Sequence, residues 1–185
     1  MRYLSVSSVL LLLVMFVTGC SEEAAPTAAL IDSSTENPTE ALSKNNVVHH
    51  ASVGGADICE ALGEPTGCDA NFSLVANEKA GGSISGQWQD TFAGGGEGIH
   101  VAIDCLNVVG NGAVVGGVIT HGTFEGVDVS GQRALTAVVD NGTSANGPPD
   151  QLSFSFFPTG GASCTNFVPG NFPLFNLTRG QVTVS

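Results

Sequence analysis

Basic residues are scarce in this sequence of 185 residues, which has five lysines and arginines against 17 aspartates and glutamates and a formal net charge of −12. The phosphate backbone of DNA or RNA has the same sign of charge and would be repelled. Tryptophan and tyrosine occur once each, so no aromatic platform for stacking bases or sugars is expected. We therefore predict no nucleic-acid partner.

The sequence motifs of common enzymes are missing as well. There is no phosphate-binding P-loop, no dinucleotide fingerprint and no His-Glu-x-x-His pair. Residues 82–86 do not form a nucleophile elbow, because Ile84 stands where the serine is required. We therefore predict a non-catalytic domain that binds a ligand or an envelope protein, or has a structural role. An enzyme is the alternative.

Sustained helical periodicity is absent, whereas 25 glycines and a charged fraction of 12% suit short strands and tight turns. We predict one all-β domain over residues 51–185, an antiparallel β-sandwich with a small β-barrel as the alternative. Apolar and polar side chains alternate in residues 83–92, and Leu152, Phe154 and Phe156 repeat this pattern. Strands are expected at residues 71–76, 83–92, 98–109, 113–121, 132–139, 151–157 and 180–184.

A signal peptide is predicted at residues 1–19. Arg2 precedes an unbroken apolar run at residues 9–17, which is much shorter than the roughly 20 residues that span a membrane. Residues 17–20, Val-Thr-Gly-Cys, resemble the bacterial lipobox. This resemblance implies cleavage before Cys20 and attachment of acyl chains such as palmitate to Cys20, and two or more chains hold stably in a membrane. An ordinary cleaved signal peptide is the alternative.

Residues 20–50 are predicted to form a lipidated, disordered linker, because acids, Pro, Ser, Thr and Ala dominate and no apolar period can bury a face. A flexible chain of this length spans on the order of 30 Å. Ser21 follows the cysteine, whereas an aspartate there would indicate retention at the inner membrane. We therefore expect a lipid-anchored protein of the bacterial cell envelope, in the outer membrane if the bacterium is Gram-negative.

Four cysteines remain once Cys20 is assigned to lipid, and an even number in an exported protein indicates disulfides. Three pairings of these four cysteines are possible, and we favour Cys59 with Cys68 because they bracket a short, turn-rich segment. Cys105 and Cys164 then form the second disulfide. Zinc is the rival interpretation, but the sequence has no Cys-x-x-Cys pair.

Residues 99–120 read as one long β-hairpin, in which two apolar, β-branched runs flank Gly110-Asn111-Gly112. Asn-Gly is a strong signal for a two-residue type I′ turn, because both turn positions need a positive φ. We therefore expect Asn111 and Gly112 at the turn, with Gly110 opposite Ala113. A three-residue turn over residues 110–112 is the alternative.

The register of this hairpin decides whether a polar cluster exists. With the two-residue turn, His121 lies opposite Ala102, and His100 and Asp104 are its diagonal neighbours on the same face. Two histidines and a carboxylate would make a weak transition-metal site or an acid–base site for a metal-dependent or acid/base enzyme. With the three-residue turn, His121 moves to the face of Val101. A solvated polar edge is the plainer interpretation.

A second candidate metal site is the loop at residues 140–150. Asp140, Asn141 and Asp150 offer oxygen ligands of the kind that Ca²⁺ prefers. The alternative is turn chemistry, because Asp and Asn form local turns and Gly142 permits unusual backbone angles. No other cofactor is expected.

Several short motifs stand out at His100, Asp104, Cys105 and Leu106; Gly110 and Asn111; Val139 to Gly142 with Pro148, Pro149 and Asp150; Ser85 to Gln87; and Arg179 with Gly180. These motifs resemble a family of bacterial exported or lipid-anchored all-β proteins to which no function is assigned. The resemblance covers residues 71–185 and implies an exported all-β fold. In this sequence Thr143 stands where members of that family often have a glutamate, so no role for that carboxylate carries over.

Overall fold

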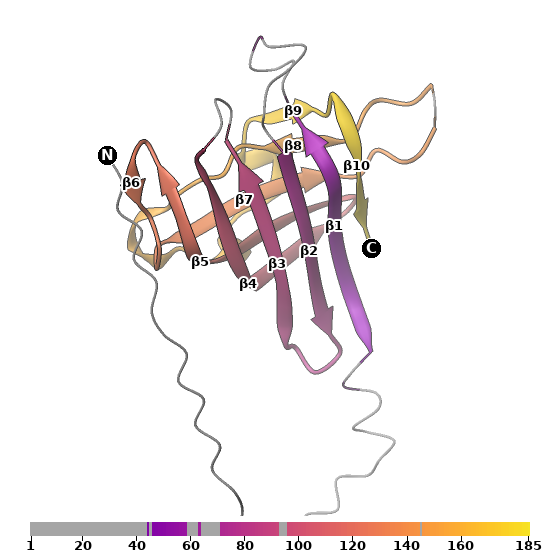
Figure 1. Ribbon diagram of the computed structural model, residues 1–185. Helices are drawn as coiled ribbons and strands as arrows, with labels where there is room; N and C mark the ends of the chain where they lie inside the picture. Colours follow the sequence, from indigo (N-terminus) through magenta and orange to yellow (C-terminus); the bar gives the residue numbers. More distant parts are fainter. Residues whose placement is uncertain (1–43, 45, 59–62, 64–70, 93–95, 145) are drawn as a thin grey trace, which may run out of the picture. The chain divides into compact units, whose positions relative to one another are not determined.

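The computed structural model describes residues 44, 46–58, 63, 71–92, 96–144 and 146–185, with only the backbone for residues 56 and 57. Within them, strands form one ten-stranded antiparallel sheet in the order β10-β1-β2-β3-β4-β5-β7-β8-β9, and β6 pairs with β5 (Figure 1). The predicted all-β, antiparallel architecture is confirmed. The predicted signal peptide, most of the predicted linker, Cys59 and Cys68 lie outside the described residues.

The strands are β1 (Val47–Asp57), β2 (Asn71–Lys79), β3 (Ile84–Thr91), β4 (Gly98–Val109), β5 (Gly112–Phe124), β6 (Val127–Asp128), β7 (Arg133–Val139), β8 (Gln151–Ser153), β9 (Leu174–Asn176) and β10 (Arg179–Val184). Three 3₁₀ helices, η1 (Thr159–Gly161), η2 (Cys164–Asn166) and η3 (Pro169–Asn171), connect β8 to β9. The sequence does not predict β1, β6 or β9. Because β1 begins at Val47, His49 and His50 belong to the sheet and not to the linker.

The sheet curls because its two longest strands, β4 and β5, bend and take part in both its front and its back layer. Figure 1 shows β1 to β4 in front, with strands behind them, β7 among them, crossing at a steep angle. One continuous sheet, curled into a half-barrel, stands in place of the two separate sheets of the predicted sandwich. Within the described residues, no helix has the length and apolar character needed to cross a membrane.

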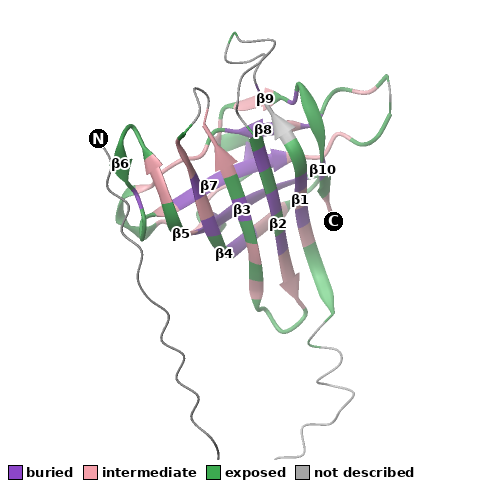
Figure 2. Cartoon of the chain, viewed as in Figure 1, coloured by how far each residue is buried: buried purple, intermediate pink, exposed green. Residues whose placement is uncertain are grey.

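The hydrophobic core fills the space between the two layers of the curled sheet. Trp88 of β3 lies in the same buried cluster as Val138 of β7 and Val182 of β10. Buried and exposed positions alternate along the front strands (Figure 2). The alternation predicted for residues 83–92 is confirmed, because Trp88 is buried between the exposed Gln87 and Gln89. The exposed positions of β3 are therefore polar.

Glycines allow β5 to bend closely over β4. A Cβ atom on Gly117 would collide with the carbonyl oxygen of Ala102, and one on Gly122 would collide with the carbonyl oxygen of Gly98. Glycine inside a strand commonly marks a place where another backbone approaches closely. The small residues that weaken the strand pattern in the sequence are thus needed for the curl of the sheet.

The strand predicted at residues 151–157 is wrong beyond residue 153. The Ser153 hydroxyl accepts a hydrogen bond from the N–H of Ala137 at 2.8 Å and donates one to the carbonyl of Phe154 at 2.9 Å. The Ser153 side chain thus occupies the N–H of Ala137, which would otherwise bond to the backbone of the neighbouring strand and extend the β-ladder. Leu152 is buried, whereas Phe154 is 40% exposed, so the predicted apolar face ends at this point.

Candidate functional site

The turn between β4 and β5 differs from the predicted one by one residue. Gly110 and Asn111 form the turn, and Gly112 already pairs with Val109. Gly110 has a φ of +62°, and among the described non-glycine residues only Glu125 has a positive φ. A positive φ at the first turn position alone is typical of a type II′ turn, not of type I′. The prediction of a turn at Asn111-Gly112 is therefore wrong.

Gly112 lies in the strand because of what packs against it. A Cβ atom there would lie 2.8 Å from the ring of Pro169 and 3.0 Å from the carbonyl oxygen of Val138. Asn111 also has a tertiary role, since its side-chain amide donates to the carbonyl of Asp140 at 2.7 Å. These distant contacts select the register, and the local turn signal does not contain them.

Two irregularities in the β4–β5 ladder then bring the histidines together. The register shifts between His100 and Val101 and again between Ile103 and Cys105, as β-bulges do. His100 consequently pairs directly with His121, and the two rings stack with centroids 4.0 Å apart and an interplanar angle of 21°. The histidines share a face as predicted, although His121 lies opposite His100 and not opposite Ala102.

Asp104, the third member of the predicted cluster, interacts with a different strand. Its carboxylate accepts two hydrogen bonds from the guanidinium of Arg133 on β7, at 2.9 and 2.7 Å. These hydrogen bonds raise the pKa of Arg133. A bidentate pair of this kind fixes the orientation of both side chains. The structure therefore assembles a pair of histidines and not the predicted cluster of two histidines and a carboxylate.

Thr120 fixes the orientation of the His121 ring. The Thr120 hydroxyl donates to the carbonyl of His100 at 3.1 Å and lies 3.2 Å from Nδ1 of His121. A hydroxyl has a single hydrogen, so Nδ1 of His121 must be the donor in the second hydrogen bond. In the neutral ring, Nε2 of His121 is then the nitrogen that bears the free lone pair.

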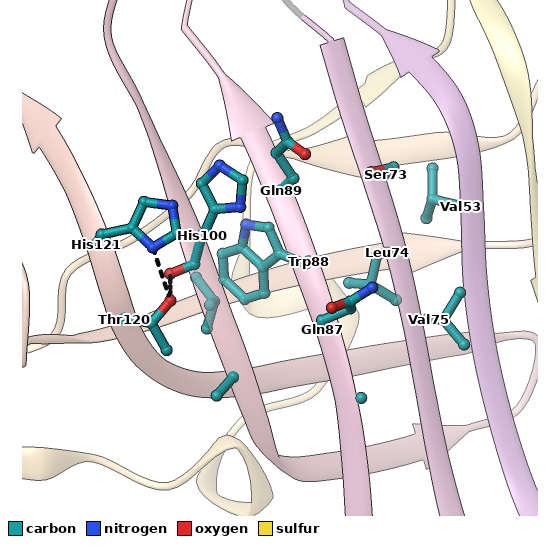
Figure 3. A pocket seen from close by; sticks show the side chains of 13 residues that line it. Val53, Ser73, Leu74, Val75, Gln87, Trp88, Gln89, His100, Thr120 and His121 are labelled. Atoms are coloured by element: carbon teal, nitrogen blue, oxygen red, sulfur yellow. Dashed lines mark hydrogen bonds between the residues drawn. The ribbon is translucent and has the colours of Figure 1, made fainter. Parts of the chain in front are cut away.

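The histidine pair lies at one side of a shallow hollow of about 370 Å³ on the outer face of the front layer (Figure 3). Adjacent strands contribute a row of paired polar residues across it, namely Ser73, Gln89, His100 and His121. Gln87 and Ala102 belong to the next row. None of the 13 lining residues is Asp, Glu, Lys or Arg, so the hollow is free of formal charge in a strongly acidic protein.

A partly buried carboxylate lies near this site on the inner face of β3. Asp90 is paired with Phe72 and Ile99 of the neighbouring strands, both of which are buried. Burial raises the pKa of Asp90 to about 6, although the hydrogen bond from the Ser155 hydroxyl, at 2.6 Å, acts in the opposite direction. The sequence shows only an acid in an alternating strand, so nothing in it marks Asp90 as unusual.

Replacing Asp90 with asparagine is expected to stabilise the protein at neutral pH by up to about 3 kcal/mol. The pKa of Asp90 rises from 3.8 to about 6 on folding, and each pKa unit corresponds to about 1.4 kcal/mol. Between pH about 4 and about 6, Asp90 keeps its proton in the folded chain but loses it in the unfolded chain. The free energy of unfolding of the parent therefore falls as the pH rises through this range. Asparagine keeps an acceptor for Ser155 and does not titrate. Urea unfolding across this pH range tests the expectation, and superimposable pH profiles of parent and variant would contradict it.

Both carboxylates of the loop at residues 140–150 accept hydrogen bonds from backbone N–H groups. Asp140 accepts from Gly142 at 2.8 Å and from Val184 of β10 at 3.1 Å. Asp150, which is 8% exposed, accepts from Asn141 at 2.8 Å and from Val182 of β10 at 2.7 Å. We call Asp140, Asp150 and these bonds to β10 the aspartate clasp.

The aspartate clasp accounts for the motif that suggested calcium. All four carboxylate oxygens of Asp140 and Asp150 accept backbone hydrogen bonds, and the Asn141 amide donates to the carbonyl of Pro149 at 2.7 Å. These bonds hold the loop without an ion, and Ca²⁺ binding stays a prediction. Among the described residues, no three His, Cys, Asp or Glu side chains gather closely enough to hold a metal ion.

One of the two predicted disulfides is confirmed. Cys105 of β4 and Cys164 of η2 are bonded, with their Cα atoms 5.9 Å apart. Both are buried in a small second cluster that includes Val114 and Leu135. The predicted Cys59–Cys68 pair lies outside the described residues.

Comparisons of the chain with protein-family models, with curated proteins and with solved structures find no match. The family resemblance drawn from the short motifs therefore stays a prediction. The function has to be argued from the hollow, the histidine pair and the predicted anchor.

Proposed function

We propose that this protein is a lipid-anchored binding protein of the bacterial cell envelope, whose β domain contacts a ligand at the hollow beside His100 and His121. The observation that carries this proposal is the hollow itself, which presents amides, hydroxyls and imidazoles without a formal charge. Such groups offer both hydrogen-bond donors and acceptors. The ligand class that fits is an uncharged, polar molecule or segment.

Two further features support this assignment. The Cys105–Cys164 disulfide is of the kind that persists in oxidising compartments such as the bacterial periplasm. The residues before Cys20 have the length and apolar character of a signal peptide and end in a lipobox-like sequence. A binding role is preferred over catalysis because Asp104, the acid expected beside the histidines, is held by Arg133.

Replacing Cys20 with alanine is expected to release the protein from membranes into the soluble fraction, because the acyl chains would be its anchor. Fractionation of cells and metabolic labelling with palmitate measure the outcome. Ser21→Ala is the matched control and should leave both the labelling and the membrane association unchanged. Persistent labelling of the Cys20→Ala protein would refute the lipobox interpretation.

The ligand site is tested with a photo-crosslinking amino acid placed in the hollow at position 87 and, as the control, at the exposed position 183 on β10. Both variants are expressed in intact cells and irradiated with a chelator present. We expect a discrete adduct from position 87 that is absent from position 183. The same adducts from both positions, or none from position 87, would refute the hollow as a binding surface.

A further inference from the structure

The histidine pair has a feature that goes beyond ligand contact at the hollow. The imidazole rings of His100 and His121, on adjacent strands, have centroids 4.0 Å apart, beside a hollow whose other lining groups have no formal charge. The two rings stack and are therefore not hydrogen-bonded to each other. Stacking leaves ring nitrogens available at the edges of the two rings.

The hydrogen bonds of His121 determine which of its nitrogens is available. The Thr120 hydroxyl donates to the His100 carbonyl, so His121 uses Nδ1–H to reach Thr120 and keeps a lone pair on Nε2. Histidine ligands of metal ions commonly use the second nitrogen in this way, which fixes both the tautomer and the ring orientation. Figure 3 shows this other nitrogen away from Thr120. The hydrogen bond to Thr120 that would orient His121 as a metal ligand is thus already in place.

From this geometry we infer that His100 and His121 form a two-histidine binding site for a divalent transition-metal ion such as Zn²⁺ or Cu²⁺. Metal–nitrogen bonds of 2.0–2.1 Å at a tetrahedral centre place two ligand nitrogens roughly 3.3 Å apart. The two rings are close, with centroids 4.0 Å apart, but the lone pair of an imidazole nitrogen lies in the plane of its ring. Because the rings stack, the His100 ring has to rotate out of the stack to direct a nitrogen at an ion held by Nε2 of His121, whose ring Thr120 keeps in place.

The chemistry of the site selects the class of ion. Imidazole suits zinc, copper and nickel, whereas calcium and magnesium require oxygen ligands. Gln89 lies directly opposite His100 on β3, and Figure 3 shows its amide at the same end of the hollow. Water completes the coordination shell, so the bound ion exchanges readily. The net charge of −12 raises the local concentration of cations near the protein.

Isothermal titration of the full-length Cys20→Ala chain with Zn²⁺ alone tests the site, because this chain has no acyl group and no thiol at position 20. We expect one ion per chain, tighter binding of Cu²⁺, and no response to Ca²⁺ or Mg²⁺. His100→Gln and His121→Gln should each weaken Zn²⁺ binding by at least tenfold. Thr120→Val, which removes only the orienting hydroxyl, should weaken it by about tenfold.

The matched control is the double variant His49→Gln and His50→Gln, which removes the other two histidines of the chain and should leave the titration unchanged. Thermal unfolding of each variant checks that it is folded. Zn²⁺ binding that survives both His100→Gln and His121→Gln, or that is lost with His49 and His50, would overturn the inference. Since the cross-link from position 87 is measured with a chelator present, failure of the metal site and failure of the ligand site give different results.

Discussion

Replacing Cys105 and Cys164 together with alanine is expected to lower the free energy of unfolding by about 4 kcal/mol. The disulfide joins residues 59 positions apart, and closing a loop of that length restricts the unfolded chain by about this amount on the loop-entropy model. Cys164 belongs to the segment of 3₁₀ helices between β8 and β9, which has few backbone bonds to the sheet. The disulfide therefore holds this segment on β4 and β5.

Urea unfolding of the double variant, compared with the parent before and after reduction, measures this effect. The reduced parent should match the variant, and the variant should not respond to reductant. Ser163→Ala is the control, because its hydroxyl lies 3.3 Å from Cys105 Sγ and its loss leaves the disulfide intact. A change of less than about 1 kcal/mol in the double variant would show that other contacts hold the segment.

The sequence predicts well those features that depend on residues close together in the chain. The alternation around Trp88 identifies β3 and its buried face, and the apolar run at residues 98–109 identifies β4 with its observed bounds. The short, turn-rich segment between Cys59 and Cys68 favours the pairing of these two cysteines, which leaves Cys105 to pair with Cys164. In each case the physical cause, a period of two or a short segment between two cysteines, is visible within the sequence itself.

Features that depend on distant partners are not predictable in this way. β1 contains His49, His50 and two glycines, so it lacks a clear alternation, and it is stabilised by pairing with β2 and β10 on its two sides. The turn at Gly110-Asn111 depends on Pro169 packing against Gly112. The direct pairing of His100 with His121 depends on bulges that no local pattern reveals. The histidine pair was thus predictable as a pair, but its geometry was not.

The aspartate clasp shows the same limit for the loop at residues 140–150. Its Asp, Asn, Gly and Pro residues predict a turn, and they do form one. The sequence does not reveal that Val184, whose backbone N–H donates to Asp140, comes from a strand 44 residues away. Within the residues that the structure describes, the sheet does not close by pairing its two end strands. Two carboxylates bond to the outer edge of β10 instead.

The direction of the backbone along β10 explains why carboxylates are required there. Ser185 exchanges two backbone hydrogen bonds with His50, at 2.8 and 2.9 Å. Because the bonding direction alternates along a strand, the N–H groups of Val184 and Val182 point to the opposite edge, where no strand pairs with β10 in the described sheet. Exposed N–H groups at a sheet edge promote pairing with another chain. Asp140 and Asp150 satisfy these groups and so protect the edge.

Replacing Asp150 with alanine should therefore lower the free energy of unfolding by about 4 kcal/mol. The carboxylate accepts two hydrogen bonds from buried or half-buried N–H groups, and the loss of each costs about 2 kcal/mol. Asp150→Asn retains one acceptor oxygen and should lose about half as much. Asp128→Ala, which removes an exposed carboxylate bonded only to its neighbour Ser130, is the control and should change stability by less than about 1 kcal/mol. Urea unfolding gives these values, and size-exclusion chromatography reports pairing through the edge of β10 freed in Asp150→Ala. Equal stability of Asp150→Ala and Asp128→Ala would mean that the sheet edge is held by other contacts and that the aspartate clasp does not stabilise the fold.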